Sequence, residues 1–332
     1  MTSGEVANAD RFDAHSDSPG MKGSIVGLDI GGTKTRGIRI EDGVVTRDET
    51  TGSANLQNVT KSEAANSLRN LFSTIGDSHV SHVCVGAGGI DTAHDEAALI
   101  ALIEPFVPHA RITVVHDTRL LLAAGYTSTG VAVIAGTGSA AWGKSDSGDE
   151  ARFGGWGYLL GDEGSGYWLG KEAVRHSLER MNQRLPVDVL TEALLESCGL
   201  QDPNMLIAHF HSSVRGRRFW AQQARVVVEA ATAGHSKSKA LLDQAGSDLA
   251  KLAVQALRQL GIEGPVILGG GLGMNVPDIQ NAFRKYLLTA GVNDVRVLDQ
   301  EPVFGVLQLI EDDSWADFRN PRAINRESRA TP

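Results

Sequence analysis

Three glycine-rich stretches carry the residue types that bind phosphate groups, and each follows a short run of β-branched residues. They are LDIGGTKT at 28–35, AGTGS at 135–139 and GGGLGMN at 269–275. Glycine lets a backbone amide approach a phosphate without hindrance from a Cβ atom, and a Thr or Ser hydroxyl adds a donor. Any one of these stretches is equally consistent with an ordinary turn. Three of them, each at a strand end, indicate a nucleotide site.

The first two stretches would hold phosphates, and the third would let an adenine and a ribose lie against bare backbone. Asp29, at the end of the first strand-like run, could hold Mg²⁺ through water, because Mg²⁺ keeps much of its hydration shell. Lys34 is assigned only to the neighbourhood of the nucleotide. The candidate ATP-binding residues are Gly31, Gly32, Thr33, Lys34, Gly136, Thr137, Gly138, Ser139, Gly270, Gly271 and Asn275.

Residues 138–145 also satisfy the P-loop pattern G-x-x-x-x-G-K-[ST]. A P-loop requires a helix directly after its Lys-Ser pair, because the N-terminus of that helix holds the phosphates. The segment DSGDEARFGGWG after Ser145 is rich in glycine, which disfavours a helix. Lys144 and Ser145 are therefore expected on a hairpin strand or in its turn.

Strand-like runs alternate with helical patterns, which is typical of an α/β protein. Strands are expected at 24–30, 35–40, 82–89, 111–117, 131–139, 265–271 and 294–299, and helices at 61–75, 165–183, 219–232 and 238–260. The glycine turns after the first and fifth runs lead directly into another strand, so both are predicted to be β-hairpins. Two copies of one device indicate a duplicated fold with a cleft between its halves.

Composition and charge exclude several other classes. The chain has 332 residues, a net charge of −9 and no basic run, so it is not expected to bind nucleic acid. Two cysteines, Cys84 and Cys198, cannot form a disulfide framework or a four-ligand zinc site. No apolar run is long enough for a membrane span and no signal peptide is recognisable, so a cytoplasmic protein is expected.

A resemblance to a known family rests on these motifs. LDIGGTKT, AGTGS and ILGGGLGMN resemble, in order and spacing, the phosphate-1, phosphate-2 and adenosine motifs of the actin/Hsp70/hexokinase superfamily. The segment FGGWGYLLGDEGSGYWLGKEAV at 153–174 resembles the N-acetylglucosamine kinase family and its BadF/BadG-type ATPase relatives, and EPVFGVLQLI at 301–310 resembles that family's closing helix. The resemblance covers roughly 22–312. It implies an α/β protein with a duplicated ribonuclease H-like fold of the actin/hexokinase type, in two domains with an interdomain cleft.

Four segments are predicted, the first and the last from their polar composition and the middle two from the resemblance. Residues 1–21 form a disordered extension, and residues 22–125 form an N-terminal α/β domain with the phosphate-1 motif, a sugar loop and the catalytic aspartate. Residues 126–312 form a C-terminal α/β domain with the phosphate-2 motif, the adenosine motif and a wall of the sugar site. Residues 313–332 form a polar tail. The resemblance also implies a homodimer.

Phosphoryl transfer requires a carboxylate that accepts the proton of the attacking hydroxyl, and Asp117 is the best candidate. It ends the run RITVVHD and precedes the helical pattern TRLLLAAGY. From the residues alone, a helix N-cap explains it equally well. The resemblance implies the catalytic role, in which Asp117 binds the sugar 6-hydroxyl and accepts its proton. The neighbouring His116 is expected to point the other way on the strand.

The other substrate-binding candidates lie in two segments. Asp162 in GDEGSG could accept hydrogen bonds from sugar hydroxyls or favour the start of the next helix, and the resemblance supports the sugar role. Trp156 and Gly157 in GGWG would form a wall against the sugar, although a lone Trp is more often a core residue. Asn55 matches a polar loop with which the family contacts the sugar, and Asn58 is a competing choice.

Residues and resemblance together predict an enzyme that uses ATP and Mg²⁺ to phosphorylate the 6-hydroxyl of an amino sugar, N-acetylglucosamine or glucosamine. One alternative is a kinase for another sugar, such as a muramic acid derivative. The other is a BadF/BadG-type ATPase that activates a radical-type reductase and holds an iron–sulfur cluster with cysteines. In a kinase, closure of the two halves would exclude water from the reaction.

Overall fold

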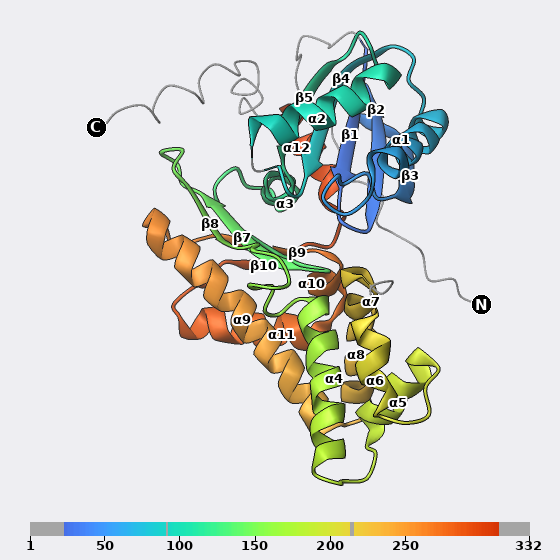
Figure 1. Cartoon of the computed structure of the whole chain (residues 1–332). Coiled ribbons are helices and arrows are strands. Elements are labelled where there is room, and N and C mark those ends of the chain that lie inside the picture. Colours follow the sequence, from blue (N-terminus) through green and yellow to red (C-terminus); the bar gives the residue numbers. More distant parts are fainter. Residues whose placement is uncertain (1–22, 91, 213–215, 312–332) are drawn as a thin grey trace, which may run out of the picture.

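The structure, a computed structural model, describes residues 23–90, 92–212 and 216–311, so the predicted N-terminal extension and polar tail lie outside it. It contains two five-stranded sheets, and each belongs to one half of the molecule (Figure 1). Within the described residues, none of the helices combines the length and the apolar composition that a membrane span requires.

The first sheet has the strand order β3-β2-β1-β4-β5. β1 (Ser24–Ile30), β2 (Lys34–Glu41) and β3 (Val44–Gly52) form an antiparallel meander. β4 (Val80–Ala87) pairs in parallel with β1, and β5 (Arg111–His116) pairs in parallel with β4. The glycine bend between β1 and β2 and the segment that follows β5 both lie at ends of strands of this sheet.

The second sheet repeats this arrangement, with the order β8-β7-β6-β9-β10. β6 (Gly130–Ala135), β7 (Ser139–Lys144) and β8 (Glu150–Gly154) form the meander. β9 (Val266–Gly269) pairs in parallel with β6, and β10 (Val295–Val297) pairs in parallel with β9. A meander followed by two parallel strands thus occurs twice, which confirms the predicted duplicated α/β fold.

Helices cover the sheets and differ greatly between the halves (Figure 1). In the first half they are α1 (Lys61–Ile75), α2 (Ala93–Ile103), the 3₁₀ helix η1 (Glu104–Phe106) and α3 (Asp117–Ala124). In the second half they are α4 (Gly166–Asn182), α5 (Val189–Cys198), α6 (Met205–His211), α7 (Arg217–Gln222), α8 (Ala224–Thr232), α9 (Ser236–Leu260), α10 (Gly271–Asn275) and α11 (Pro277–Thr289). The 3₁₀ helix η2 (Pro302–Phe304) and α12 (Gly305–Glu311) end the described chain.

The end of the chain returns to the first half. Val303, Val306 and Leu309 are buried in one apolar cluster with residues of the first sheet, including Ile25 and Ile38. In Figure 1, α12 accordingly lies beside α3 and the first sheet. The predicted domain limits at 125 and 126 stay a prediction, but the segment from Pro302 packs with the first half.

Several predicted elements differ from the observed ones in extent. The run 131–139 is not one strand, because β6 ends at Ala135 and β7 begins at Ser139. Lys144 is the last residue of β7, and Ser145 lies in the turn that follows, where its amide donates to Asp149 O at 2.9 Å. No helix follows the Lys-Ser pair here, so the P-loop interpretation is excluded.

Candidate active site

The two predicted phosphate-binding bends, at 31–34 and 136–139, lie against each other. They connect β1 to β2 and β6 to β7, so each occupies the corresponding place in its own half. The hydroxyl oxygens of Thr33 and Thr137, which are far apart in sequence, lie 3.2 Å from each other. The backbone amides and hydroxyls of both bends therefore converge on one region between the halves.

The third glycine stretch adjoins the second bend. Gly270 has a φ of +84°, and a Cβ atom there would lie 2.6 Å from the carbonyl oxygen of Ala135. Only glycine lets the end of β9 pack so closely on the end of β6. Helix α10 begins at Gly271, and Asn275 donates from Nδ2 to the carbonyl oxygen of Gly271 at 2.8 Å. The predicted adenosine motif thus borders the predicted phosphate site.

Asp117 is the first residue of α3, and its side chain is 18% exposed. Gly88 makes room for it, because a Cβ atom at that position would lie 2.8 Å from Asp117 Oδ2. Its other oxygen, Oδ1, is buried and has no hydrogen-bond partner among the described residues. A carboxylate with an unpaired acceptor is suited to receive a hydroxyl proton from a ligand.

The prediction that His116 points away from Asp117 is wrong. His116 Nδ1 lies 3.0 Å from Asp117 Oδ1, although its hydrogen bond is with Thr118 Oγ1 at 2.7 Å. Strand alternation does not apply here, because β5 ends at His116 and the backbone turns into α3 at Asp117. His116, not Asp117, is the N-cap of that helix.

Asp29 shares the electrostatic field of Asp117. It is half-buried on β1, and burial, then the charges of Asp117 and Glu301, raise its pKa to about 7, while Lys34 and Arg36 act in the opposite direction. Two carboxylates that repel each other next to a phosphate site would be relieved by a divalent cation. Their oxygen donors fit the Mg²⁺ predicted at Asp29.

Lys34 is tied to the end of the chain. Its Nζ donates to Glu301 Oε1 at 2.8 Å, and Arg36 lies 3.6 Å from the same oxygen. This pairing partly neutralises the charge of Lys34 and leaves it at the edge of the first bend. The placement agrees with a position near the nucleotide rather than a P-loop type of phosphate contact.

Asn55 lies next to Asp117 through Gly88. Its Nδ2 donates to Gly88 O at 3.0 Å, and its Oδ1 accepts from Gln57 N at 2.9 Å. Asn58, the competing choice, instead lies over the first bend, where a Cβ atom on Gly32 would be 3.3 Å from its Nδ2.

A mostly apolar pocket of about 200 Å³ opens beside Asn55 and Gly88. Its lining consists of Ile30, Ala54, Asn55, Leu56, Gln57, Ala87, Gly88, Gly89, Ile90, His94, Asp95, Ala98 and Leu99. Because Gly88 also contacts Asp117, the pocket adjoins the predicted catalytic carboxylate. A ligand held at Asp117 could place an apolar substituent there.

The side chain of Asp162 contacts the second bend. It has a φ of +67° and is only 2% exposed. Its Oδ1 accepts from Ser139 N at 3.2 Å, and its Oδ2 accepts from Arg217 Nη2 at 2.7 Å. The sequence pointed to Asp162 but not to Arg217, because nothing in RGRRFW distinguishes this arginine from its neighbours.

Trp156 and Gly157 precede Asp162 in the same loop. Trp156 is 67% exposed, and Gly157 has a φ of +81°, a conformation that favours glycine. A Cβ atom on Gly161 would lie 3.5 Å from the indole ring, so Trp156 covers the chain just before Asp162. Trp156 is thus a surface side chain beside the site rather than a core residue.

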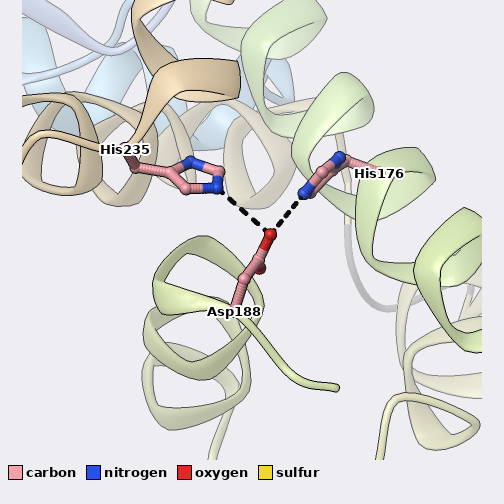
Figure 2. Close-up of side chains that lie close together, drawn as sticks. All are labelled: His176, Asp188 and His235. Carbon is pink, nitrogen blue, oxygen red and sulfur yellow. Dashed lines mark hydrogen bonds and ion pairs between the residues drawn. The ribbon is translucent and has the colours of Figure 1, made fainter. Parts of the chain in front are cut away.

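A separate cluster of ionisable side chains lies in the helical part of the second half. Figure 2 shows His176 of α4 and His235 pointing at one oxygen of Asp188. His176 Nε2 is 2.7 Å and His235 Nε2 is 3.1 Å from Asp188 Oδ2, and Arg180 Nε is 3.2 Å from the same atom. Asp188 Oδ1 accepts from Thr191 N at 3.0 Å, as the N-cap of α5.

Two imidazoles and a carboxylate are also a ligand set for a metal ion, since their donor atoms lie within 4.8 Å of one another. The cluster is nevertheless complete without one. The Arg180 guanidinium already balances the carboxylate, and His235 Nδ1 accepts the amide proton of Ser238, which places the imidazole proton on Nε2, facing Asp188. The arrangement supports a hydrogen-bonded tie between helices.

The sequence matches the family described as the BadF/BadG/BcrA/BcrD ATPase family over residues 26–305. It is 31% identical over 274 residues to the N-acetylmuramic acid/N-acetylglucosamine kinase of Clostridium acetobutylicum, which covers 79% of this chain and 90% of that protein. It is 28% identical over 268 residues to the N-acetyl-D-glucosamine kinase of Dictyostelium discoideum, covering 74% of this chain and 84% of that protein.

The solved structure of a candidate N-acetylglucosamine kinase from Chromobacterium violaceum has a TM-score of 0.70 and 26% identity, covering 87% of this chain and 99% of that one. This likeness confirms the predicted two-domain α/β fold. The family match extends from β1 to the start of α12 and includes all three glycine stretches and the segment 153–174. The chain therefore belongs to the BadF/BadG/BcrA/BcrD ATPase family.

Proposed function

We propose that this chain is an ATP-dependent sugar kinase that phosphorylates the 6-hydroxyl of an amino sugar, N-acetylglucosamine or glucosamine. The observation that carries the proposal is the meeting of the two bends at Thr33 and Thr137, next to a carboxylate with an unpaired oxygen. Asp117 belongs to that region because Asn55, which donates to Gly88 beside Asp117, is hydrogen-bonded through Ser53 to Gly31 of the first bend.

The proposed chemistry uses both halves. Amides and hydroxyls of the two bends bind the phosphates, and Asn55 and Asp117 bind the sugar. The sugar oxygen attacks the γ-phosphorus, its proton passes to Asp117, and the bond between the γ-phosphorus and the β,γ-bridging oxygen breaks, so that ADP leaves with the electron pair. Mg²⁺ held near Asp29 would neutralise charge on the phosphates.

A muramic acid derivative is a second candidate acceptor. Its N-acyl group is a small, largely apolar substituent that a pocket of about 200 Å³ can hold, whereas the carboxylate of its lactyl ether would have to stay outside the apolar part of that pocket. The relative from Clostridium acetobutylicum is named for both N-acetylmuramic acid and N-acetylglucosamine. Either acceptor uses the same catalytic groups.

The reductase-activator alternative has little support in the structure. An iron–sulfur cluster requires thiolates that can reach it. Cys84 lies in β4 with no exposed surface, and burial raises the pKa of its thiol to about 12. Cys198 alone cannot hold a cluster. The homodimer implied by the resemblance stays a prediction.

ADP release over a panel of sugars tests the proposal. The panel contains N-acetylglucosamine, glucosamine, N-acetylmuramic acid and glucose, each with and without Mg²⁺. We expect Mg²⁺-dependent ADP release with at least one amino sugar, and a phosphate at the 6-position in the product by NMR. ADP release that is independent of every sugar, or confined to glucose, would contradict the proposal.

A further inference from the structure

Both oxygens of Asp162, a proposed sugar ligand, are engaged by the protein itself. Ser139 N donates to Oδ1 and Arg217 Nη2 donates to Oδ2. With only 2% of its side chain exposed, Asp162 can be reached by a sugar hydroxyl only if a group that covers one of its oxygens moves away. The amide of Ser139 is fixed in the bend, whereas the Arg217 side chain is 29% exposed and can change rotamer.

Arg217 lies directly against the second phosphate-binding bend. A Cβ atom on Gly138 would collide with Arg217 Nη2, so the guanidinium occupies the space that this glycine leaves open. Helix α7 is seated closely on α4, because a Cβ atom on Gly170 would collide with the carbonyl oxygen of Trp220. The close packing fixes the backbone of α7 and leaves the guanidinium within reach of the bend.

One donor of this arginine is unused. Arg217 Nε is buried and has no hydrogen-bond partner among the described residues. An unpaired buried donor on a charged group is costly, and such atoms in a native structure often serve a ligand. A phosphate oxygen pair is the matching acceptor, because Nε and an Nη atom form a fork that binds phosphate through two parallel hydrogen bonds.

We infer that Arg217 is a phosphate-binding residue that Asp162 holds until the sugar arrives; this rests on the proposed kinase function. Sugar hydroxyls donate to Asp162 Oδ2 and replace Arg217 Nη2 there. The released guanidinium turns to the phosphate beside Gly138, where Nε and an Nη atom both find acceptors. Its positive charge then stabilises the phosphoryl group during transfer.

The exchange couples the two substrates. Without sugar, the carboxylate of Asp162 neutralises the guanidinium, so ATP meets a weaker positive field and its hydrolysis by water stays slow. With sugar bound, the same guanidinium is available to the nucleotide. By linkage, the sugar must tighten the binding of a nucleoside triphosphate, and the nucleotide must tighten the binding of the sugar by the same factor.

The first test compares Arg217→Gln with Arg218→Gln, a change at the exposed neighbour on the same helix. With N-acetylglucosamine and ATP, Arg217→Gln should lower kcat by about 10²-fold or more, as expected for an arginine that neutralises phosphoryl charge. Titration with AMP-PNP, with and without the sugar, should show that this variant has lost the tightening seen in the wild type. Arg218→Gln should behave as the wild type.

The second test is Asp162→Asn, which releases the arginine without sugar. Asparagine tolerates the positive φ of this position and retains the bond from Ser139, so the fold should be kept. In the absence of any sugar, Asp162→Asn should bind AMP-PNP about 5-fold or more tighter than the wild type, by linkage. The double variant Asp162→Asn/Arg217→Gln should lose that gain.

The outcomes separate the two proposals. If the wild type does not bind AMP-PNP, the kinase proposal and this inference both fall. If it does, but Asp162→Asn binds AMP-PNP no tighter, only the inference falls, and this comparison requires no sugar. An Arg217→Gln variant that raises the KM for sugar at unchanged kcat would also overturn it, because Arg217 would then only position Asp162.

Discussion

Asp162 and Asp188 are both shielded carboxylates of the second half, yet their surroundings differ. Asp188 receives hydrogen bonds from two imidazoles and one backbone amide, with Arg180 beside the same oxygen as the imidazoles (Figure 2). Asp162 has one amide and one arginine, and that arginine keeps a buried Nε unpaired. The complete network fixes three helices, whereas the incomplete one lies at the proposed phosphate site.

The difference separates a structural role from a functional one. Burial acts to raise the pKa of Asp188, but the hydrogen bonds from His176 and Thr191 hold that pKa well below its ordinary value. A carboxylate so strongly paired contributes to stability. Among the buried polar atoms without a hydrogen-bond partner in the described part of the chain, Thr191 Oγ1 lies beside Asp188, whereas Arg217 Nε and Asp117 Oδ1, which belong to charged groups, lie in the region of the two glycine bends.

The greatest change is predicted at Asp117, whose Oδ1 has no hydrogen-bond partner among the described residues. Asp117→Asn should lower kcat by about 10²-fold or more, because the amide cannot accept the hydroxyl proton. Sugar binding, measured by calorimetry, should change much less. Asp77→Asn, at an exposed position of the same half, is the control and should leave kcat unaltered. A variant at 117 with nearly full kcat would remove Asp117 from the reaction.

Breaking the complete network should lower stability rather than activity. Asp188→Ala removes the α5 N-cap and leaves His176, His235 and Arg180 without their shared acceptor. The free energy of unfolding, measured in urea, should therefore fall by about 2–3 kcal/mol. Since the folded pKa is depressed, the contribution of Asp188 is present above its ordinary pKa of about 3.8 and fades as pH falls below it. The difference in the free energy of unfolding between Asp188→Ala and the wild type should therefore become smaller at acidic pH.

Asp202→Ala provides the matched control for that experiment. Asp202 is an exposed residue before α6 whose carboxylate accepts only from Asn204 among the described residues. Its loss should change the free energy of unfolding by less than about 1 kcal/mol. Equal losses for the two variants would mean that the His-Asp-His network contributes nothing beyond an ordinary cap.

The least change is predicted at Asp29, whose ionised carboxylate lowers the stability of the fold. Its pKa of about 7 lies above its ordinary 3.8, so ionisation lowers stability progressively as pH rises from about 4 to 7. In metal-free buffer at pH 8, Asp29→Asn should raise the free energy of unfolding by on the order of 2 kcal/mol. The gain should shrink towards pH 4, and Asp42→Asn, in an exposed turn, should show neither change.

Local patterns predicted the parts of the fold that local physics decides. β1 and α1 begin and end where the sequence indicates, because β1 is a continuous buried run and Thr60 and Glu63 form a capping box before α1. β3 was not predicted, since this edge strand is largely polar. α2 was missed as well, because its run of consecutive apolar residues does not distinguish a helix from a strand.

The candidate site divides in the same way. Glycine bends and carboxylates at strand ends can be recognised in the sequence, because their chemistry requires particular residue types at particular places. The contacts between Thr33 and Thr137 and between Asp162 and Arg217 cannot, because each joins segments that only the tertiary fold brings together. His116 was misplaced because the end of β5 depends on where α3 begins.

The return of the chain end to the first half has a consequence for biosynthesis. Val303, Val306 and Leu309 complete an apolar cluster that begins with Ile25, yet they leave the ribosome after nearly all other described residues. Leu120 and Ala123 of α3 cover part of this cluster early, but the part that contacts Val303, Val306 and Leu309 stays open to solvent until η2 and α12 arrive. The half made first can therefore seal its interior only after the segment from Val303 to Leu309 has left the ribosome.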